Sequence, residues 1–308
     1  LHLSIRRQRQ MCIRDSPTTA SERGPAQRRP PREARTSTLN TIVHHNYCAY
    51  IINMDRSPER LQAMSTWLEG YGMPWVRVPA VDGRALDLDR HPDVSVPGYR
   101  RLHGKDINPA EVGCYLSHIR AFDQFLASSH DYALILEDDA MFSSDPGAVL
   151  KGLMDAPTRW DLAKLSGYHS GRPVALSSLP DGHALCVPLT KYSGSNAYLI
   201  NRRAAAIYRE QLLPMDLPYD HAFDRAWRYG IKYRMVTPAL CLPDESGTLP
   251  STISVSAQRR LPWYRRFSVV AYRAGNELSR VLWGTCTVIR HKFGLEAVSY
   301  THLRAHET

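Results

Sequence analysis

The chain has no cysteine pair at the spacing of a metal or redox site. Its six cysteines lie far apart and form no C-x-x-C pair, which argues against a zinc ribbon or a thioredoxin-type site and is typical of a reducing compartment. No stretch reaches the roughly 18 apolar residues of a membrane-spanning helix, and the amino end has no apolar signal-peptide core. We therefore expect a cytoplasmic protein.

Glycine-rich phosphate-binding loops of either common spacing are also absent, as are internal repeats. A phosphate-bearing ligand would therefore have to be held by a metal ion and basic groups. What the chain does have is 308 residues, 43% of them apolar. This allows one large domain or two small ones, with a sizeable core.

Positive charge is concentrated at the two ends. The net charge of +9 divides into +6 for residues 1–40, −3 for residues 41–257 and +6 for residues 258–308. A mildly acidic central part does not support a broad nucleic-acid-binding face. Nucleic acid is therefore not an expected partner.

The two ends also differ from the centre in composition. Residues 1–40 are rich in Arg, Pro, Ser and Thr without periodicity and are predicted to be disordered. Met11–Ser16 and the tail 299–308 resemble translated sequencing-adaptor sequence. We therefore expect the natural protein to begin near residue 40 and its natural carboxyl end to be missing.

Between these ends, the hydrophobic pattern alternates between strands and helices. Predicted strands are 47–53, 75–80, 132–136, 162–165, 196–200 and 232–236, and predicted helices are 58–70, 109–126, 202–212 and 219–229. This alternation indicates an α/β fold with a mainly parallel sheet flanked by helices. We place it in a single domain at residues 41–257.

Three consecutive carboxylates follow one of the predicted strands. The apolar run Tyr132–Leu136 leads directly into Glu137, Asp138 and Asp139. Side chains alternate along a strand, so Glu137 and Asp139 are expected on one face and Asp138 on the other. Carboxylates at a strand end repel each other unless cations neutralise them, and ligands of open α/β sheets bind there. The triplet indicates a divalent metal that holds a phosphate-bearing substrate; solvated loop residues or helix N-caps are the alternative.

Five segments carry a resemblance to a known family. They are Tyr50–Arg60, Ala80–Gly83, Glu111–His118, Leu134–Asp139 and Gly194–Ile200. In this order they resemble glycosyltransferase family 25, which contains lipopolysaccharide, lipooligosaccharide and collagen galactosyltransferases. The resemblance implies a GT-A-type fold, a nucleotide-sugar donor that is most often a UDP-hexose, a divalent cation and an inverting transfer. The chain departs from the family in its Glu-Asp-Asp motif, and in Asn196, where the family usually has a small residue or Thr.

The metal site is expected at the carboxylate triplet. Mn²⁺ or Mg²⁺, hard cations that prefer carboxylate oxygen, would neutralise the leaving diphosphate. Asp139 is the leading ligand, either alone or with Glu137 on the same strand face. Asp138 either orients the site and contacts the donor, or is a solvated loop carboxylate.

Candidate donor contacts lie at the ends of the first two strands. Asn53 and Arg56 follow the first strand, where a nucleotide binds in a doubly wound sheet. The alternative for Arg56 is an ion pair with Asp55 across the turn. Asp82 either accepts a hydrogen bond from the uracil or ribose, or belongs to an ordinary Asp-Gly turn.

Three further residues are candidates for donor binding. Ser117 and His118 lie on the helix that precedes the acidic strand, and the family resemblance gives His118 a role in the site. A lone helical histidine is otherwise more often a structural residue. Lys164 either approaches the donor phosphates or is a surface lysine at a strand edge.

A general base is expected near the acceptor hydroxyl, because an inverting transfer requires one and carboxylates usually supply it. Asp220 is the candidate, and Asp224, one helical turn later, is the reserve. The alternative for Asp220 is an N-cap that starts the predicted helix.

The carboxyl-terminal segment 258–298 combines basic and apolar residues. Its aromatic side chains at Trp263, Tyr264, Phe267 and Trp283 suit an anionic membrane surface. This predicts a peripheral position on the inner face of the cytoplasmic membrane. A helix that packs on the fold with a solvated basic face is the alternative.

Together these features predict a transferase that moves a hexose, with galactose expected, from a UDP-sugar to a glycan acceptor. Lipopolysaccharide core or O-chain, or another lipid-linked saccharide, is the expected acceptor. A non-catalytic sugar-binding module on the same fold is the first rival. A metal-dependent phosphoryl hydrolase is the second, although no second acidic or histidine cluster with two-metal spacing is visible.

Overall fold

The computed structural model describes residues 46–167, 171–242 and 267–295, which belong to one compact unit. The strands are β1 (Tyr47–Asn53), β2 (Trp75–Pro79), β3 (Tyr132–Glu137), β4 (Met141–Phe142), β5 (Leu162–Lys164), β6 (Pro173–Ser178), β7 (Ala184–Pro188), β8 (Ala197–Asn201), β9 (Tyr233–Thr237) and β10 (Cys241–Leu242). The helices are α1 (Pro58–Gly70), α2 (Val96–His103), α3 (Pro109–Ala127), α4 (Gly147–Met154), α5 (Arg202–Gln211), α6 (Tyr219–Ala222), α7 (Ala226–Tyr229) and α8 (Phe267–Lys292), with short 3₁₀ turns η1 (Gly83–Ala85), η2 (Pro157–Arg159) and η3 (Pro180–Gly182). The predicted leader, the adaptor-like segments and residues Trp263 and Tyr264 lie outside the described residues.

Eight of the strands form one mixed sheet in the order β2–β1–β3–β8–β5–β9–β7–β6. β1 runs parallel to both β2 and β3, so the carboxyl ends of three strands meet at one edge. β8 is antiparallel to both β3 and β5, and β6 and β7 form an antiparallel pair at the far edge. The predicted α/β class is confirmed, and the edge where β1, β2 and β3 end is where such sheets bind ligands.

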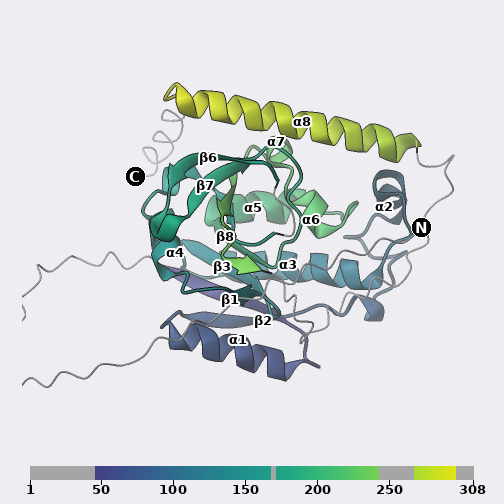
Figure 1. Cartoon of the computed structure of the whole chain (residues 1–308). Coiled ribbons are helices and arrows are strands. Elements are labelled where there is room, and N and C mark those ends of the chain that lie inside the picture. The colour runs from purple at the N-terminus through teal and green to yellow at the C-terminus, as the bar shows by residue number, and fades with distance from the viewer. Residues whose placement is uncertain (1–45, 168–170, 243–266, 296–308) are drawn as a thin grey trace, which may run out of the picture. The chain divides into compact units, whose positions relative to one another are not determined.

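Helices cover both faces of this sheet, and strand alternation explains how. In β1, the side chains of Cys48, Tyr50 and Ile52 join a core with α3, α5, α6 and α7, whereas Ala49 and Ile51 join a core with α1 and α4. Figure 1 shows α1 below the strands and α7 above them. The acidic strand is therefore buried on both faces, which explains its continuous apolar run.

Two glycines bring the end of β2 against the start of α3. Asn108 caps α3 as predicted, because its side chain accepts a hydrogen bond from the backbone of the first turn. A Cβ atom at Gly113 would lie 2.5 Å from the carbonyl oxygen of Val81, and one at Gly83 would lie 1.8 Å from that of Pro109. Only glycine permits this approach, which fixes the turn after β2 beside the helix.

The structure breaks one predicted helix and adds short elements that were not predicted. The predicted continuous helix 219–229 is wrong: α6 and α7 are separate, and Arg225 between them has φ −85° and ψ 58°. The break allows Asp224 to be buried in an ion pair with Arg280 of α8, at 2.8 Å. α2, α4, β6 and β7 were not predicted, because these short segments lack a clear periodic pattern.

α8 packs on the rest of the unit along β6, β7, α2 and α7. Gly284 allows the close approach, since a Cβ there would lie 2.8 Å from the side chain of Leu189. This packing matches the alternative of a helix on the fold, although it leaves the outer face of α8 open. Among the described helices, none has the length and hydropathy needed to cross a bilayer.

Candidate nucleotide-sugar and metal site

A cavity of about 340 Å³ lies at the carboxyl ends of β1, β2 and β3, next to the first turns of α1 and α3. We call it the strand-end cavity. Seven of the predicted site residues line it: Arg56, Asp82, Ser117, His118, Glu137, Asp138 and Asp139. The topology thus brings together residues more than 80 positions apart in the chain.

Asp138 is held in place by two groups from the neighbouring elements. Asn53 donates to it at 2.7 Å and Arg60 of α1 donates at 3.1 Å. Its side chain is 11% exposed, so the alternative of a solvated loop carboxylate is wrong. Burial raises the pKa of Asp138, while the hydrogen bonds from Asn53 and Arg60 oppose the rise. Asn53 itself is buried behind the cavity and acts through Asp138.

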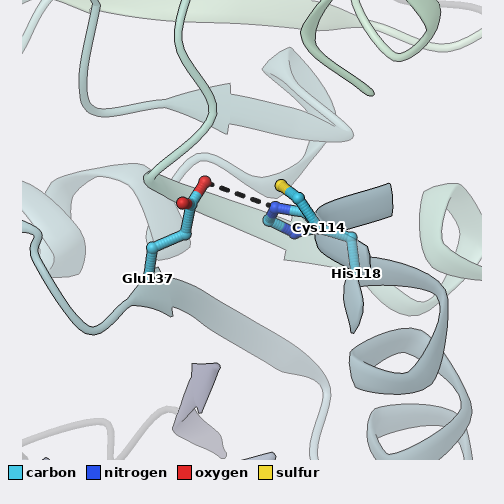
Figure 2. A group of neighbouring side chains, drawn as sticks. All are labelled: Cys114, His118 and Glu137. Carbon is cyan, nitrogen blue, oxygen red and sulfur yellow. Dashed lines mark ion pairs between the residues drawn. The ribbon is translucent and has the colours of Figure 1, made fainter. Parts of the chain in front are cut away.

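Glu137 faces α3 rather than α1. Figure 2 shows its carboxylate pointing toward His118 and Cys114, which lie one helical turn apart on α3. One Glu137 oxygen lies 3.5 Å from Nε2 of His118, and Nδ1 of His118 is 3.0 Å from the hydroxyl of Tyr198. The imidazole also stacks on Tyr219, with ring centroids 3.9 Å apart. The ring is therefore fixed with Nε2 directed at the carboxylate.

Asp139 lies beyond the end of β3, so strand alternation no longer determines its direction. It lines the same cavity as Glu137 and Asp138. Burial, and then the charges of Glu137 and Asp138, raise the pKa of Asp139 to about 7. The carboxylates of the triplet therefore share a site whose negative charge is only partly balanced.

The chemistry of these side chains fits a divalent cation. Nε2 of His118 is buried and has no hydrogen-bond partner among the described residues. Ligand atoms of Cys114, His118 and Glu137 all lie within 4.8 Å of one another. Burial, followed by the charges of Glu137, Asp220 and Asp139, raises the pKa of the Cys114 thiol well above its usual range. The neutral thiol is therefore favoured, and the oxygen ligands suit a hard cation.

Two arginines line the side of the cavity formed by the ends of β1 and β2. Arg56 lies 3.0 Å from Asp82, and Arg84 lies 2.7 Å from the same carboxylate. The expected alternative of an Arg56–Asp55 pair is wrong, because Asp55 pairs with Arg77. Hydrogen bonds from Arg84 hold the pKa of Asp82 well below its usual range. Asp82 also caps η1 by accepting from the backbone of Arg84, so its turn role is confirmed.

Ser117 joins α3 to the end of β2. Its hydroxyl accepts from the backbone nitrogen of Val81 at 2.8 Å and donates to the carbonyl oxygen of Gly113 at 2.6 Å. These bonds position the turn that carries Asp82. The role of Ser117 in the structure is thus to shape the cavity.

Four predicted site residues do not line the strand-end cavity: Asn53, Lys164, Asp220 and Asp224. Lys164 is fully buried, donates to the carbonyl oxygen of Tyr192 at 2.5 Å, and is not a surface lysine. Burial lowers the pKa of Lys164 to about 7, although Asp224 and Asp220 oppose the shift. Asp224 is occupied by its ion pair with Arg280. The structure therefore does not bring Lys164 or Asp224 to this cavity.

Asp220 does not line the strand-end cavity, but its charge acts on a residue that does. Its carboxylate lies 3.8 Å from Nε2 of His221, and its charge contributes to the raised pKa of Cys114, which lines the strand-end cavity. Burial works against its ionisation, but His221, Lys191 and Lys164 together hold the pKa of Asp220 below its ordinary value. Asp220 is therefore ionised at neutral pH.

Sequence reasoning missed three residues of the cavity: Arg60, Arg84 and Cys114. For Cys114 a signal existed, because Cys114 and His118 are four residues apart in a predicted helix and so share a face. For Arg60 the only signal was its place in the family-like segment Tyr50–Arg60. For Arg84 no signal existed, because a surface arginine is the usual expectation.

The fold and cavity define the class of this protein: an α/β protein with a polar ligand site at the carboxyl ends of parallel strands. A family model described as glycosyltransferase family 25 (LPS biosynthesis protein) matches residues 47–172. Over this segment, which carries every residue lining the strand-end cavity, the chain is similar to glycosyltransferase family 25.

Curated relatives are similar to part of this chain. A glycosyltransferase 25 family member of Aedes aegypti is 34% identical over 120 residues, which cover 37% of this chain and 20% of the relative. Procollagen galactosyltransferase 1 of Danio rerio is 26% identical over 179 residues, 56% of this chain and 30% of the relative. The inactive glycosyltransferase 25 family member 3 of Homo sapiens is 31% identical over 124 residues, 38% of this chain and 21% of the relative. The matched part thus spans less than a third of each relative.

Proposed function

We propose that the protein is a glycosyltransferase that moves a hexose from a UDP-sugar to a glycan acceptor. The observation that carries this proposal is the strand-end cavity, which is lined by four carboxylates and three arginines in a segment that matches the family 25 model. A nucleoside diphosphate needs both kinds of group: cations for its phosphates and carboxylates for a bridging metal ion.

Arg56 and Arg84 are the proposed contacts for the donor diphosphate. Both line the cavity and share the carboxylate of Asp82, so a phosphate group could replace one of these two ion pairs at little cost. Asp82 is the proposed acceptor for a donor hydroxyl or base N–H group. Asn53, Ser117 and Asp138 support these contacts by fixing the three strand ends.

Asp139 and Glu137 are the proposed ligands of Mn²⁺ or Mg²⁺. Such an ion would supply charge neutralisation to the leaving diphosphate. Asp139 carries the raised pKa expected of a buried carboxylate beside other carboxylates. Glu137 lies 3.5 Å from Nε2 of His118, which makes no hydrogen bond among the described residues. His118 is the proposed third ligand or the orienting partner of Glu137.

Asp220 is the proposed general base. It is ionised at neutral pH and lies within electrostatic reach of the strand-end cavity. In the proposed step, the Asp220 carboxylate takes the proton of an acceptor hydroxyl, whose oxygen forms a bond to the anomeric carbon. The bond from that carbon to the UDP oxygen breaks on the opposite face, and UDP leaves with the bonding pair. Asp224 is not proposed as the base, because Arg280 occupies it.

Galactose is the proposed sugar, because a relative is named procollagen galactosyltransferase 1. A lipid-linked or lipopolysaccharide-type saccharide is the proposed acceptor. The support is α8, whose outer face is apolar, with exposed side chains at Phe267, Val270, Leu278 and Leu282. We propose that this face rests on an anionic membrane, which would place the acceptor within reach.

The donor proposal is tested by Mn²⁺-dependent release of UDP from UDP-galactose. Asp139→Asn removes the charge but keeps the shape, and we expect UDP release to fall by at least about 100-fold, the loss expected when several kcal/mol of metal-assisted stabilisation disappears. Asp131→Asn, an exposed aspartate at the start of the same strand, is the matched control and should leave release unchanged. Full activity of Asp139→Asn would refute the metal role.

Cys114→Ser distinguishes the two possible ligand sets. If carboxylates hold a hard cation, the variant keeps Mn²⁺-dependent release, because its hydroxyl preserves the cavity. If Cys114 is instead a ligand, the variant should lose UDP release, and Zn²⁺ or Cd²⁺ should support release in the unmodified protein but not in the variant.

A second candidate function is a non-catalytic module that binds a nucleotide sugar. It is favoured by the human relative, which is named inactive. Calorimetry separates the two functions: UDP binding that needs Asp139, without any UDP release from UDP-sugars in the presence of acceptor saccharides, would identify the module.

A further inference from the structure

A second cavity, of about 450 Å³, lies between α8, α2 and α6. We call it the α8 cavity. Its charged lining residues are Lys105, Lys191, Arg273, Arg280, Asp224 and Glu277. Its volume lies within the roughly 300–1,000 Å³ of small-molecule sites. Cations outnumber carboxylates by two in this lining, although the central part of the chain is acidic overall.

Both carboxylates of the lining are already paired with one arginine. Arg280 lies 2.8 Å from Asp224 and 3.3 Å from Glu277. Lys191 is hydrogen-bonded through Nζ to Nε2 of His221. Burial lowers the pKa of His221 to about 4, so this partner is neutral at pH 7. The two carboxylates of the lining are thus paired with Arg280, and Asp220 beside the cavity offsets only part of the remaining charge of Lys105, Lys191 and Arg273. This leaves positive potential in the cavity.

His103 supplies an independent sign of a ligand. It lines the cavity, is 7% exposed, and its Nε2 has no hydrogen-bond partner among the described residues. Its ring lies edge-on to His221, with centroids 5.4 Å apart. A buried polar atom without a partner costs free energy unless a ligand or water satisfies it. Gly104, at φ 79°, ends α2 directly after His103 and lets Val269 of α8 approach closely, which holds His103 at the cavity.

The α8 cavity adjoins the proposed general base. His221 lines the cavity, and its Nε2 lies 3.8 Å from the carboxylate of Asp220. Asp220 in turn acts on Cys114, which lines the strand-end cavity. Asp220 is therefore within electrostatic reach of both cavities, as a base that serves a donor in one and an acceptor in the other must be.

We propose that the α8 cavity binds an anionic saccharide through its phosphate or carboxylate group, and that this saccharide is the acceptor. The acceptor role rests on the proposed function, whereas the binding itself does not. Arg273 and Lys191 would pair with the anion, and Nε2 of His103 would gain a partner. An anion would also raise the pKa of His103, which burial, His221, Lys105 and Arg273 lower to about 3.

The test is calorimetric titration of the whole chain, saturated with UDP and Mn²⁺, using three probes: glucose 6-phosphate, glucuronate and glucose. We expect the anionic probes to bind and glucose to bind far more weakly; the stronger of the two anions identifies the group. Arg273→Gln and Lys191→Gln should each weaken binding by at least about fivefold, as expected for loss of one charge-assisted hydrogen bond. Arg290→Gln, an exposed arginine on the same helix, is the matched control. Histidine NMR signals should shift for His103 and His221.

Equal binding of glucose and glucose 6-phosphate would overturn the inference, as would unchanged binding in folded Arg273→Gln and Lys191→Gln. Binding that occurs only without UDP would also overturn it, because the probe would then occupy the strand-end cavity. The two proposals fail separately. UDP release without probe binding removes the α8 cavity site alone, and probe binding without UDP binding removes the donor site alone.

Discussion

Asp138 and Asp139 are neighbours in the chain, but their charges are balanced differently. Asp138 receives hydrogen bonds from Asn53 and Arg60, so its charge is compensated within the protein. For Asp139, burial and the charges of Glu137 and Asp138 raise the pKa to about 7. This difference is why Asp139 is the residue to change when the metal role is tested, and why Asp138 is expected to affect folding as well.

Histidines of the α8 cavity predict a pH dependence of stability. The folded-state pKa of His103 is lowered to about 3, by burial first and then by His221, Lys105 and Arg273, with Asp220 opposing the shift. Below about pH 6.5, the unfolded state therefore binds a proton that the folded state does not, so stability falls as the pH falls. Between pH 7 and pH 5, this single group should remove about 2 kcal/mol of the free energy of unfolding.

The measurement is urea unfolding of the unmodified protein and of His103→Gln at pH 7 and pH 5. Other groups titrate in both proteins, so the difference between the two pH dependences isolates His103. We expect the variant to lose about 2 kcal/mol less than the unmodified protein over this range. Parallel pH dependences would show that His103 is protonated at pH 5 in the folded protein.

The start of α3 is the element that holds the strand-end cavity together. It carries Gly113, Ser117 and His118, and it lies against the turn Val81–Gly83. A small displacement of this helix moves the end of β2 relative to β1 and β3. The geometry of the strand-end cavity therefore depends on a contact between backbone atoms as well as on the side chains that line it.

Gly113→Ala tests this dependence. The new Cβ would lie 2.5 Å from the carbonyl oxygen of Val81 and 2.8 Å from the backbone nitrogen of Gly83. Since both neighbours are backbone atoms, we expect a loss of about 1–3 kcal/mol in the free energy of unfolding, and weaker UDP binding. The matched control is Gly70→Ala at the end of α1, where a Cβ meets nothing within 4 Å. It should be neutral, or stabilising by up to about 1 kcal/mol. Calorimetric unfolding and UDP titration check both variants. Equal stability and equal UDP affinity of the two variants would show that the contact between Gly113 and Val81 does not maintain the cavity.

At the scale of the whole molecule, the sequence predicted those features that depend on residues close together in the chain. Six of the eight strands of the sheet and the Asn108 cap are visible in the sequence because apolar periodicity and capping chemistry are local. The α8 cavity is not visible, because it forms where Arg273 and Arg280 meet Lys191 and His103 from distant parts of the chain. The burial of Lys164 was equally hidden, since lysine is almost never fully buried. Long-range packing, rather than residue type, decides these features.

The two faces of α8 differ in exposure: one packs on the unit and the other is exposed. Val269, Arg280 and Thr287 face the unit and are buried, whereas Phe267, Val270, Leu278, Val281, Leu282 and Ile289 are exposed apolar residues. At 3.6 residues per turn, these six side chains fall within an arc of about 120° and so lie along one stripe of the helix. The last turn carries Arg290 and Lys292. An apolar stripe beside basic residues is the pattern of a helix that lies in the surface of an anionic membrane.

Membrane docking through this stripe predicts that vesicles containing phosphatidylglycerol will sediment the protein, and that purely phosphatidylcholine vesicles will do so less. Leu278→Asp with Leu282→Asp should reduce sedimentation by at least about tenfold, because two leucines no longer bury apolar surface in the membrane. Both side chains are more than half exposed, so the variant should fold and keep UDP binding. Tyr71→Asp, an exposed apolar residue beyond α1, is the matched control and should sediment like the unmodified protein. If the double variant sediments equally well, the stripe does not dock on lipid, and the acceptor must reach the α8 cavity from solution.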